Sequence, residues 1–253
     1  MAPTANYKTA LVTGSGKKRV GNAVARALAA RGFAIAVHYH HSAVEAKQTV
    51  AELRAAGAEA EAFQADVSRE TSIDGLVQKI LDRFGRLDAL VTCASVWQPK
   101  SLEEIGEEDL RRNFDVNTLG TFLCCQKAGL AMCRQPEGGA IVTVADWALA
   151  RPYRNYAAYF ASKGAIPTLT RTLAVELAAR NPRVRVNCVM PGPVMLPDDL
   201  PEAERRAAIA GTLVGREGSP ENVAHAVVFL VENDFVTGVC LPVDGGRTLK
   251  GAD

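Results

Sequence analysis

Several features are scarce or missing in this 253-residue chain. No apolar run reaches the roughly 20 residues that a membrane-spanning helix requires, so no membrane segment is expected. The start, MAPTANYKTALVTG, lacks a charged region followed by a long apolar core, and therefore predicts no secretion signal. The formal charge of +1 lacks the excess of one sign that nucleic-acid or membrane surfaces require. No nucleic-acid or membrane partner is expected.

No pair of cysteines has the C-x-x-C spacing, and most of the cysteines lie in apolar stretches, where a free thiol behaves as a small hydrophobe. These observations favour a reduced, cytoplasmic protein with no metal site. The chain has six cysteines, at positions Cys93, Cys124, Cys125, Cys133, Cys188 and Cys240.

What the chain does contain is a strict alternation of short apolar runs and helical patterns. Because alternating strands and helices form a parallel sheet with helices on both faces, we expect an α/β fold in one domain spanning residues 1–253. Strands are predicted at residues 9–13, 33–40, 59–65, 87–91, 140–145, 184–189 and 239–243. Helices are predicted at residues 22–31, 43–56, 71–84, 109–133, 155–180, 201–211 and 220–232.

A tyrosine and a lysine four residues apart form the first candidate for chemistry. Tyr159 and Lys163 project from one face of the predicted helix 155–180. An ammonium group beside a phenol favours the phenolate and lowers the pKa of the tyrosine, which makes it a usable acid or base. Asp146 follows the predicted strand 140–145, and the end of a parallel strand is where α/β proteins place their sites. The alternatives are a solvated helix face and a salt bridge from Asp146 to Arg151 or Arg154.

The first strand is followed by the glycine-rich loop GSGKKRVG, residues 14–21, and then by a helix. Glycines let the backbone approach a pyrophosphate, and the helix N-terminus supplies free N–H groups. Strand, glycine-rich turn and helix are the context that a dinucleotide fingerprint requires. Gly14, Ser15, Lys18, Arg19 and Val20 are therefore candidate cofactor-binding residues.

The second strand ends in His40, His41 and Ser42, without an acidic residue. NAD-binding proteins typically place Asp or Glu there to bond the ribose 2′-hydroxyl. Imidazoles, a hydroxyl and the cations of the glycine-rich loop suit a 2′-phosphate instead, so NADP(H) is the predicted cofactor. The alternatives are a polar strand end and a metal pair that includes His38, for which no third ligand is suitably spaced.

These motifs resemble the short-chain dehydrogenase/reductase family over almost the whole chain. The matching pieces are Thr13-Gly14, Asp66-Val67, Asn117, Tyr159-x-x-x-Lys163, Pro191-Gly192 and Asp244-Gly245-Gly246. The resemblance implies a seven-stranded Rossmann sheet, a nicotinamide cofactor and a homotetramer, or else a homodimer. It also implies a segment near residues 194–214 that covers the substrate.

Within that family the sequence is most similar to pteridine reductases. Lys18-Arg19-Val20-Gly21 resembles their K-R-L-G, and residues 38–43, HYHHSA, resemble their H-Y-H-R-S-A. Thr92-Cys93-Ala94-Ser95, followed by Trp97, resembles their N-N-A-S and stacking aromatic. Asp146 stands where the family's catalytic serine is usual. Two departures are one residue inserted between Gly14 and Gly21, and Thr92-Cys93 in place of Asn-Asn.

The resemblance implies a role for each of these residues. Tyr159 donates a proton, Lys163 lowers its pKa and bonds the nicotinamide ribose, and Asn117 anchors a water molecule. Asp146 orients a pterin-like heterocycle while NADPH reduces a C=N bond. Trp97 lies against the ring, and Arg19 and Ser95 reach its polar edge or the pyrophosphate of the cofactor. The remaining contacts to the cofactor come from Asp66, Val67, Ala94, Pro191, Gly192 and Val194.

Two other functions stay open at this point. A reductase of 3-oxoacyl thioesters or other ketones has the same fold, and the missing serine argues against it. A non-catalytic NADP(H)-binding module belongs to another class, but it would have no chemical need for Tyr159 and Lys163. The alternative for Trp97 is an ordinary core or subunit-contact tryptophan.

Overall fold

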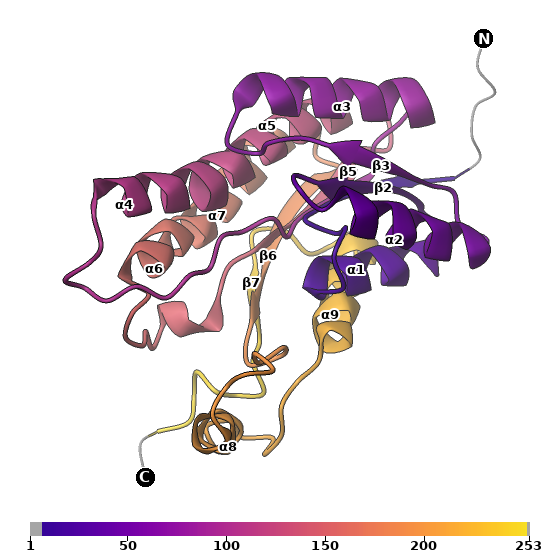
Figure 1. Ribbon diagram of the computed structural model, residues 1–253. Coiled ribbons are helices and arrows are strands. Elements are labelled where there is room, and N and C mark those ends of the chain that lie inside the picture. Colours follow the sequence, from indigo (N-terminus) through magenta and orange to yellow (C-terminus); the bar gives the residue numbers. More distant parts are fainter. Residues whose placement is uncertain (1–6, 252–253) are drawn as a thin grey trace.

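A single seven-stranded sheet forms the centre of the computed structural model, which describes residues 7–251 (Figure 1). All neighbouring strands are parallel, in the order β3-β2-β1-β4-β5-β6-β7. The predicted α/β Rossmann fold with seven parallel strands is confirmed. The strands are β1 Thr9–Thr13, β2 Ala34–Tyr39, β3 Ala60–Gln64, β4 Ala89–Thr92, β5 Gly139–Val144, β6 Val184–Pro191 and β7 Cys240–Val243.

Helices cover both faces of this sheet, as Figure 1 shows. Strands buried on both faces need an apolar layer above and below, which explains why β1 is buried along its whole length. One core cluster joins the sheet to α1 Val20–Ala29, α2 Ala43–Ala55 and α9 Pro220–Glu232. The other joins it to α3 Glu70–Phe84, α5 Gly120–Cys133 and α7 Ile166–Ala178.

Two long helices expected from the sequence are each divided. The predicted helix 109–133 consists of α4 Glu107–Asn113, the π-helical stretch η1 Phe114–Leu119 and α5. The predicted helix 155–180 consists of α6 Ala157–Gly164 and α7, which meet at Ala165. Pro167 lies in the first turn of α7, and proline lacks the N–H that would bond the carbonyl of Lys163 in a continuous helix.

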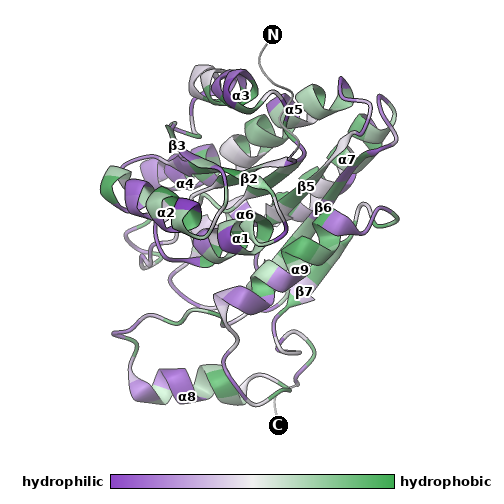
Figure 2. Cartoon of the chain, turned by 90° about the vertical axis from the view of Figure 1, so that its right-hand side faces the viewer, coloured by the Kyte–Doolittle hydropathy of each residue, from purple (hydrophilic) through white to green (hydrophobic). Residues whose placement is uncertain are grey.

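The segment between β6 and α9 lies away from the sheet. It carries α8 Glu202–Ala210, which Figures 1 and 2 place at the end of the molecule where the described chain also ends. Figure 2 shows strands β5 and β6 as predominantly hydrophobic and α8 as mixed. The sheet order reverses between β1 and β4, and a crevice opens outside the carboxyl ends of the strands at such a point.

Candidate active site

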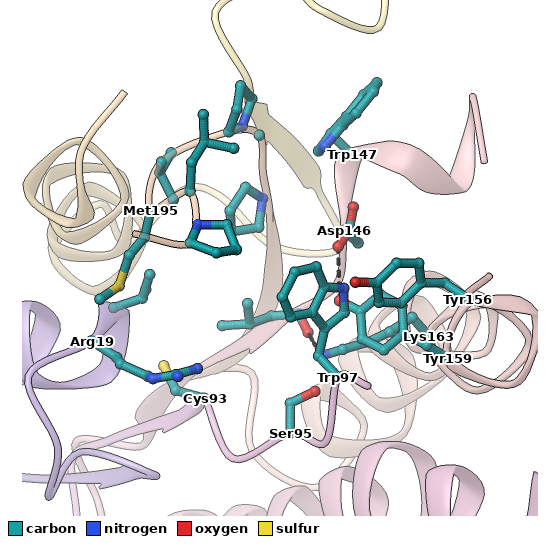
Figure 3. A pocket seen from close by; sticks show the side chains of 18 of the residues that line it. Arg19, Cys93, Ser95, Trp97, Asp146, Trp147, Tyr156, Tyr159, Lys163 and Met195 are labelled. Atoms are coloured by element: carbon teal, nitrogen blue, oxygen red, sulfur yellow. Dashed lines mark hydrogen bonds between the residues drawn. The ribbon is translucent and has the colours of Figure 1, made fainter. Parts of the chain in front are cut away.

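A tyrosine and a carboxyl group meet at the carboxyl end of β5. Tyr159 lies on α6, and its hydroxyl donates to Oδ2 of Asp146 at 2.7 Å (Figure 3). Lys163, one turn further along α6, donates from Nζ to the carbonyl oxygen of Val144 at 2.7 Å. The structure thus brings together the three residues that were separated by up to 17 positions in the sequence.

The backbone that follows β5 fixes the carboxyl group of Asp146. Asp146 is the N-cap of the short 3-10 helix η2 Trp147–Leu149, and its Oδ1 accepts from the N–H of Ala148 at 2.8 Å. Burial raises the pKa of Asp146, against the lowering effects of the Ala148 and Tyr159 hydrogen bonds and of Lys163. The protonated acid therefore persists to higher pH than in an exposed aspartate.

The expected lowering of the tyrosine pKa by Lys163 is wrong for this arrangement. Burial raises the pKa of Tyr159, and the neighbouring Asp146 raises it further by charge and by hydrogen bonding. The ammonium group is directed at a backbone carbonyl, and burial lowers the pKa of Lys163. Both effects favour the neutral phenol of Tyr159 over its phenolate.

Asn117 lies behind the cavity wall and is fully buried within η1. Its Oδ1 accepts from the N–H of Val96 at 2.8 Å and from Oγ of Ser95 at 3.0 Å. Its Nδ2 donates to the carbonyl of Val96 at 3.1 Å and to Oγ of Ser162 at 2.9 Å. Asn117 therefore joins the loop after β4 to the helix that carries Tyr159. The water link to Lys163 stays a prediction.

The turn after β1 permits an unusually close approach of two backbones. Gly14 has φ +65°, and a Cβ there would lie 3.0 Å from backbone atoms of Ala94. Its N–H donates to Nδ1 of His38 at 3.0 Å, and Nε2 of His38 lies 3.1 Å from the carbonyl of Ala65, to which it donates. Burial lowers the pKa of His38 to about 4, so the imidazole stays neutral and able to accept. The sequence analysis did not predict that His38 supports the turn at Gly14. A histidine within an otherwise apolar strand could have indicated such a buried hydrogen-bonding role.

Only part of the glycine-rich loop faces the cavity. Arg19 and Val20 line it, as does Lys17, which the sequence reasoning left undecided. Ser15 is buried and donates to the carbonyl of Val12 at 2.7 Å, while Lys18 lies 3.5 Å from Glu52 on the surface. Of the two lysines of this loop, Lys17 lines the cavity and Lys18 does not.

Of the three residues predicted to bind the cofactor after β2, two line the cavity and the third does not. His40 and Ser42 line it, whereas His41 stacks on His40 with ring centroids 3.6 Å apart. Asp66 lies outside the wall, where its carboxylate accepts from the N–H and hydroxyl of Ser68 at 3.0 and 2.6 Å. Val67 is buried and packs closely against Gly120, where an added Cβ would lie 2.9 Å from the Val67 carbonyl oxygen.

These elements enclose a cavity of about 960 Å³ that runs from the glycine-rich loop to η2 and the start of α8. The other predicted residues are on its wall: Ala94, Ser95, Trp97, Asp146, Tyr159, Lys163, Pro191, Gly192 and Val194. The segment predicted to cover the substrate contributes Val194, Met195, Leu196, Pro197, Leu200, Glu204 and Ala208.

An aromatic cluster forms the wall beside Tyr159, and two of its members were missed. Trp97 stacks on Tyr156, the residue before α6, with ring centroids 4.9 Å apart and an interplanar angle of 17°. Tyr153 meets Tyr156 edge to face at 5.1 Å. One face of the indole is therefore covered by the protein itself, as Figure 3 shows. The short spacing of tyrosines in RPYRNYAAY was the signal.

The residues around Gly14 fit a dinucleotide. The glycine admits no side chain between the two backbones, and no side chain within the described chain caps the N-terminus of α1. Arg19, Val20 and Gly21, where that helix begins, line the cavity, and the free N–H groups of a helix N-terminus suit a pyrophosphate.

Comparison with known proteins agrees with this geometry. A family model described as enoyl-(acyl carrier protein) reductase matches residues 15–248. The chain belongs to the short-chain dehydrogenase/reductase family. It is therefore an oxidoreductase of a family that binds nicotinamide cofactors.

Individual relatives cover nearly the whole chain. The 3β-hydroxysteroid dehydrogenase 1 of Eggerthella lenta is 35% identical over 96% of this chain and 94% of its own length. The 3-oxoacyl-[acyl-carrier-protein] reductase of Synechocystis is also 35% identical, over 96% and 97%. The crystal structure of acetoin dehydrogenase from Enterobacter cloacae superposes with a TM-score of 0.85, at 32% identity over 97% of both chains.

The names of these relatives bear on the predicted similarity to pteridine reductases. Their names describe hydroxysteroid, 3-oxoacyl and acetoin chemistry, in which a carbonyl and an alcohol are interconverted. The closeness to pteridine reductases is not borne out by them, and the ketone alternative fits them better than pterin reduction. Family membership was predicted correctly, and the subgroup was assigned from short motifs alone.

Among residues 7–251 there is no helix that is long and apolar enough to cross a membrane. Across the same residues, no group of three or more His, Cys, Asp or Glu side chains is placed to hold a metal ion.

Proposed function

We propose that this protein is an NADP(H)-dependent oxidoreductase that reduces the carbonyl group of a small molecule, or oxidises the corresponding alcohol. The observation that carries the proposal is the 2.7 Å hydrogen bond between Tyr159 and the buried carboxyl group of Asp146, on the wall of the cavity that reaches Gly14. Tyr159 and Asp146 can each hold a proton, and both line the part of the cavity in which the carbonyl group of the substrate would be reduced. The chemistry of the named relatives supports the carbonyl class.

In this mechanism the bound cofactor supplies the hydride to the carbonyl carbon. Tyr159 donates its phenolic proton to the carbonyl oxygen once that oxygen replaces Asp146 as its hydrogen-bond acceptor. Asp146, when protonated, donates a second hydrogen bond to the same oxygen, as a serine hydroxyl would. Because burial raises the pKa of Asp146, this donor form is available at higher pH than for an exposed carboxyl group.

NADP(H) is favoured over NAD(H) by the residues at the end of β2. His40 and Ser42 line the cavity there together with Lys17 and Arg19 from the glycine-rich loop. Cationic and hydroxyl groups suit a 2′-phosphate, whereas a 2′-hydroxyl is usually bonded by an acidic residue.

Reduction of a C=N bond in a pterin-like heterocycle is a second candidate, and the carboxyl group of Asp146 favours it. An ionised carboxylate accepts from amino and ring N–H groups and repels a developing alkoxide. Trp97 and Tyr156 add a flat apolar surface beside Tyr159, against which a bicyclic ring could lie.

A substrate panel with NADPH separates these candidates. It contains acetoin, a 3-oxoacyl thioester, a steroid ketone, dihydrobiopterin and dihydrofolate. For the wild type we expect turnover of ketones, and for Tyr159→Phe a loss of roughly a hundredfold or more in kcat, because the proton donor is removed. The affinity for NADPH, measured by fluorescence, should stay unchanged.

Variants of Asp146 decide between the carbonyl and C=N mechanisms. With rising pH we expect ketone reduction by the wild type to decline as Asp146 ionises. Asp146→Ser keeps a hydroxyl donor, so ketone reduction should persist in this variant without that decline. Pterin reduction should be lost in the same variant. Normal turnover by Tyr159→Phe would contradict both mechanisms, and NADPH binding without any turnover would support the non-catalytic module.

A further inference from the structure

The end of the cavity farthest from the glycine-rich loop is cationic. Arg247, beyond β7, lines the cavity, and its guanidinium lies over the ring of Trp147, 4.6 Å from the centroid. It also donates to the carbonyl oxygen of Ala208, in the last turn of α8. These contacts hold the guanidinium between η2 and α8.

Beside Arg247 lies a smaller hollow of about 300 Å³ that shares wall residues with the main cavity. Trp147, Tyr153 and Arg247 line both spaces. The hollow is lined by Trp147, Arg151, Pro152, Tyr153, Gly211, Arg247, Lys250 and Gly251, which include three cationic side chains and no acidic one.

The three cations have neutral partners among the described residues. Arg151 donates to the carbonyl of Lys250, and Lys250 donates to the carbonyl of Ala210 at 2.5 Å. Burial, and next to it the like charge of Arg151, lowers the pKa of Arg247. Asp244 is the nearby acid, and its carboxylate accepts from Gly246 and Thr248. Asp244 offsets part of the repulsion among the cations, and an anion between them would relieve the rest.

This cationic hollow lies next to the proposed reacting residue Asp146. Trp147, which supports Arg247, is the residue after Asp146, and Figure 3 shows its ring on the far side of Asp146 from Arg19. A substrate whose reacting carbon lies at Tyr159 therefore meets Arg247 with an end that extends past Trp147. The main cavity alone, at about 960 Å³, has room for a cofactor and such a chain.

We propose that Arg247, supported by Arg151 and Lys250, binds an anionic group of the substrate. The proposal deepens the proposed function: the substrate is a ketone, or its alcohol, that carries a carboxylate or phosphate several atoms from the reacting carbon. Arg247 then determines specificity, because its planar guanidinium pairs with such an oxyanion through two parallel hydrogen bonds.

Binding is tested without turnover, on the full chain saturated with NADP(H), by isothermal titration calorimetry. The probes are heptanoate, heptanamide and hexyl phosphate, so that carboxylate, neutral and phosphate ends of similar length are compared. We expect the wild type to bind one or both anions, and Arg247→Gln to bind them at least tenfold more weakly, while heptanamide affinity stays the same. Arg154→Gln removes one charge from the main cavity outside the hollow and serves as the matched control, with less than a threefold effect.

Kinetics test the same residue in the reaction. Methyl-ketone acids of increasing length are compared with their methyl esters, and Arg247→Gln should raise KM for the acids at least tenfold with little change in kcat or for the esters. Arg151→Gln, a change at an exposed side chain, should raise KM for the acids about threefold, and it replaces Arg247→Gln if that variant does not fold.

Three results would overturn the proposal: no binding of either anion by the wild type, equal affinity in Arg247→Gln, or an equal loss for heptanamide and the esters. Failure of the proposed function is distinct from these. If no ketone is turned over while anion binding still depends on Arg247, the anion site stands and the carbonyl chemistry falls.

Discussion

The imidazole of His38 shows how a buried side chain can set the shape of a cofactor loop without touching the cavity. It accepts from the N–H of Gly14 and donates to the carbonyl of Ala65, so it joins the turn after β1 to the end of β3. Only the neutral ring can do both. The backbone of the predicted cofactor turn therefore depends on the protonation state of His38.

A pH dependence of stability follows from this residue. The pKa of His38 is about 4 in the folded chain, below its ordinary value of 6.5, so its contribution is complete above pH 6.5 and is lost as the pH falls towards 4. Because the unfolded chain binds this proton at higher pH than the folded chain, the free energy of unfolding should fall by about 3 kcal/mol from pH 7 to pH 4. Urea unfolding of His38→Gln should show a correspondingly flatter pH dependence than the wild type.

The control for this prediction is His225→Gln, because His225 lies exposed on α9. It should leave the pH dependence of the wild type unchanged. Parallel curves for wild type and His38→Gln would show that His38 is not the titrating group.

At the scale of elements, the interruptions of regular helices coincide with the site. The π-helical stretch η1 carries Asn117, whose side chain would face a different direction if the helix continued with α-helical spacing. The break between α6 and α7 follows Lys163 by two residues. Periodicity predicted both helical regions but not these breaks. Apolar spacing does not distinguish an α-helical turn from the π-helical turn of η1, whereas Pro167 was a sequence signal for the break between α6 and α7.

The C-terminus of α9 depends on one buried arginine of β6. Arg185 donates to the carbonyls of Leu230, Val231 and Val236 at 2.8, 2.7 and 3.0 Å. Arg185→Met should lower the unfolding free energy by about 2–4 kcal/mol, because it leaves these carbonyls without their charged donor. Thermal unfolding measures the loss. Arg180→Met, which removes an exposed pair with Glu176, should cost less than about 0.5 kcal/mol. Equal losses for both would argue against a capping role.

At the scale of the whole molecule, the site exists because the sheet order reverses between β1 and β4. The reversal brings the glycine-rich loop beside the ends of β4 and β5, while α8 and the chain after β7 close the far side. Several exposed apolar side chains lie on α4, η1 and α5, namely Leu110, Phe114, Leu119 and Leu130. The homotetramer stays a prediction.

The preference for NADPH or NADH can be measured by the thermal unfolding of the whole chain with each cofactor. If Lys17 and its neighbours bind a 2′-phosphate, NADPH should raise Tm more than an equal concentration of NADH, since tighter binding to the folded state stabilises it more. Lys17→Ala should weaken NADPH binding about five- to tenfold and leave NADH binding unchanged. Lys18→Ala is the matched control, since Lys18 does not line the cavity. Equal Tm shifts for the two cofactors would refute NADP(H) preference.

The sequence by itself determined the fold class and the family, and it predicted the reacting residues. Alternating strand and helix periods depend only on local spacing, and Tyr159, Lys163 and Asp146 belong to motifs of a few residues each. Both kinds of signal can be recognised in the sequence without knowing which distant segments come into contact.

Only the tertiary structure decided how those residues interact. The carboxyl group of Asp146 accepts a hydrogen bond from the Tyr159 hydroxyl, whose pKa Lys163 was expected to lower. Lys17 lines the cavity in place of Lys18, and Arg247 lies over Trp147, 100 residues away in the sequence. Such relations depend on the packing of segments remote in sequence, because burial and neighbouring charges arise only once the chain is folded.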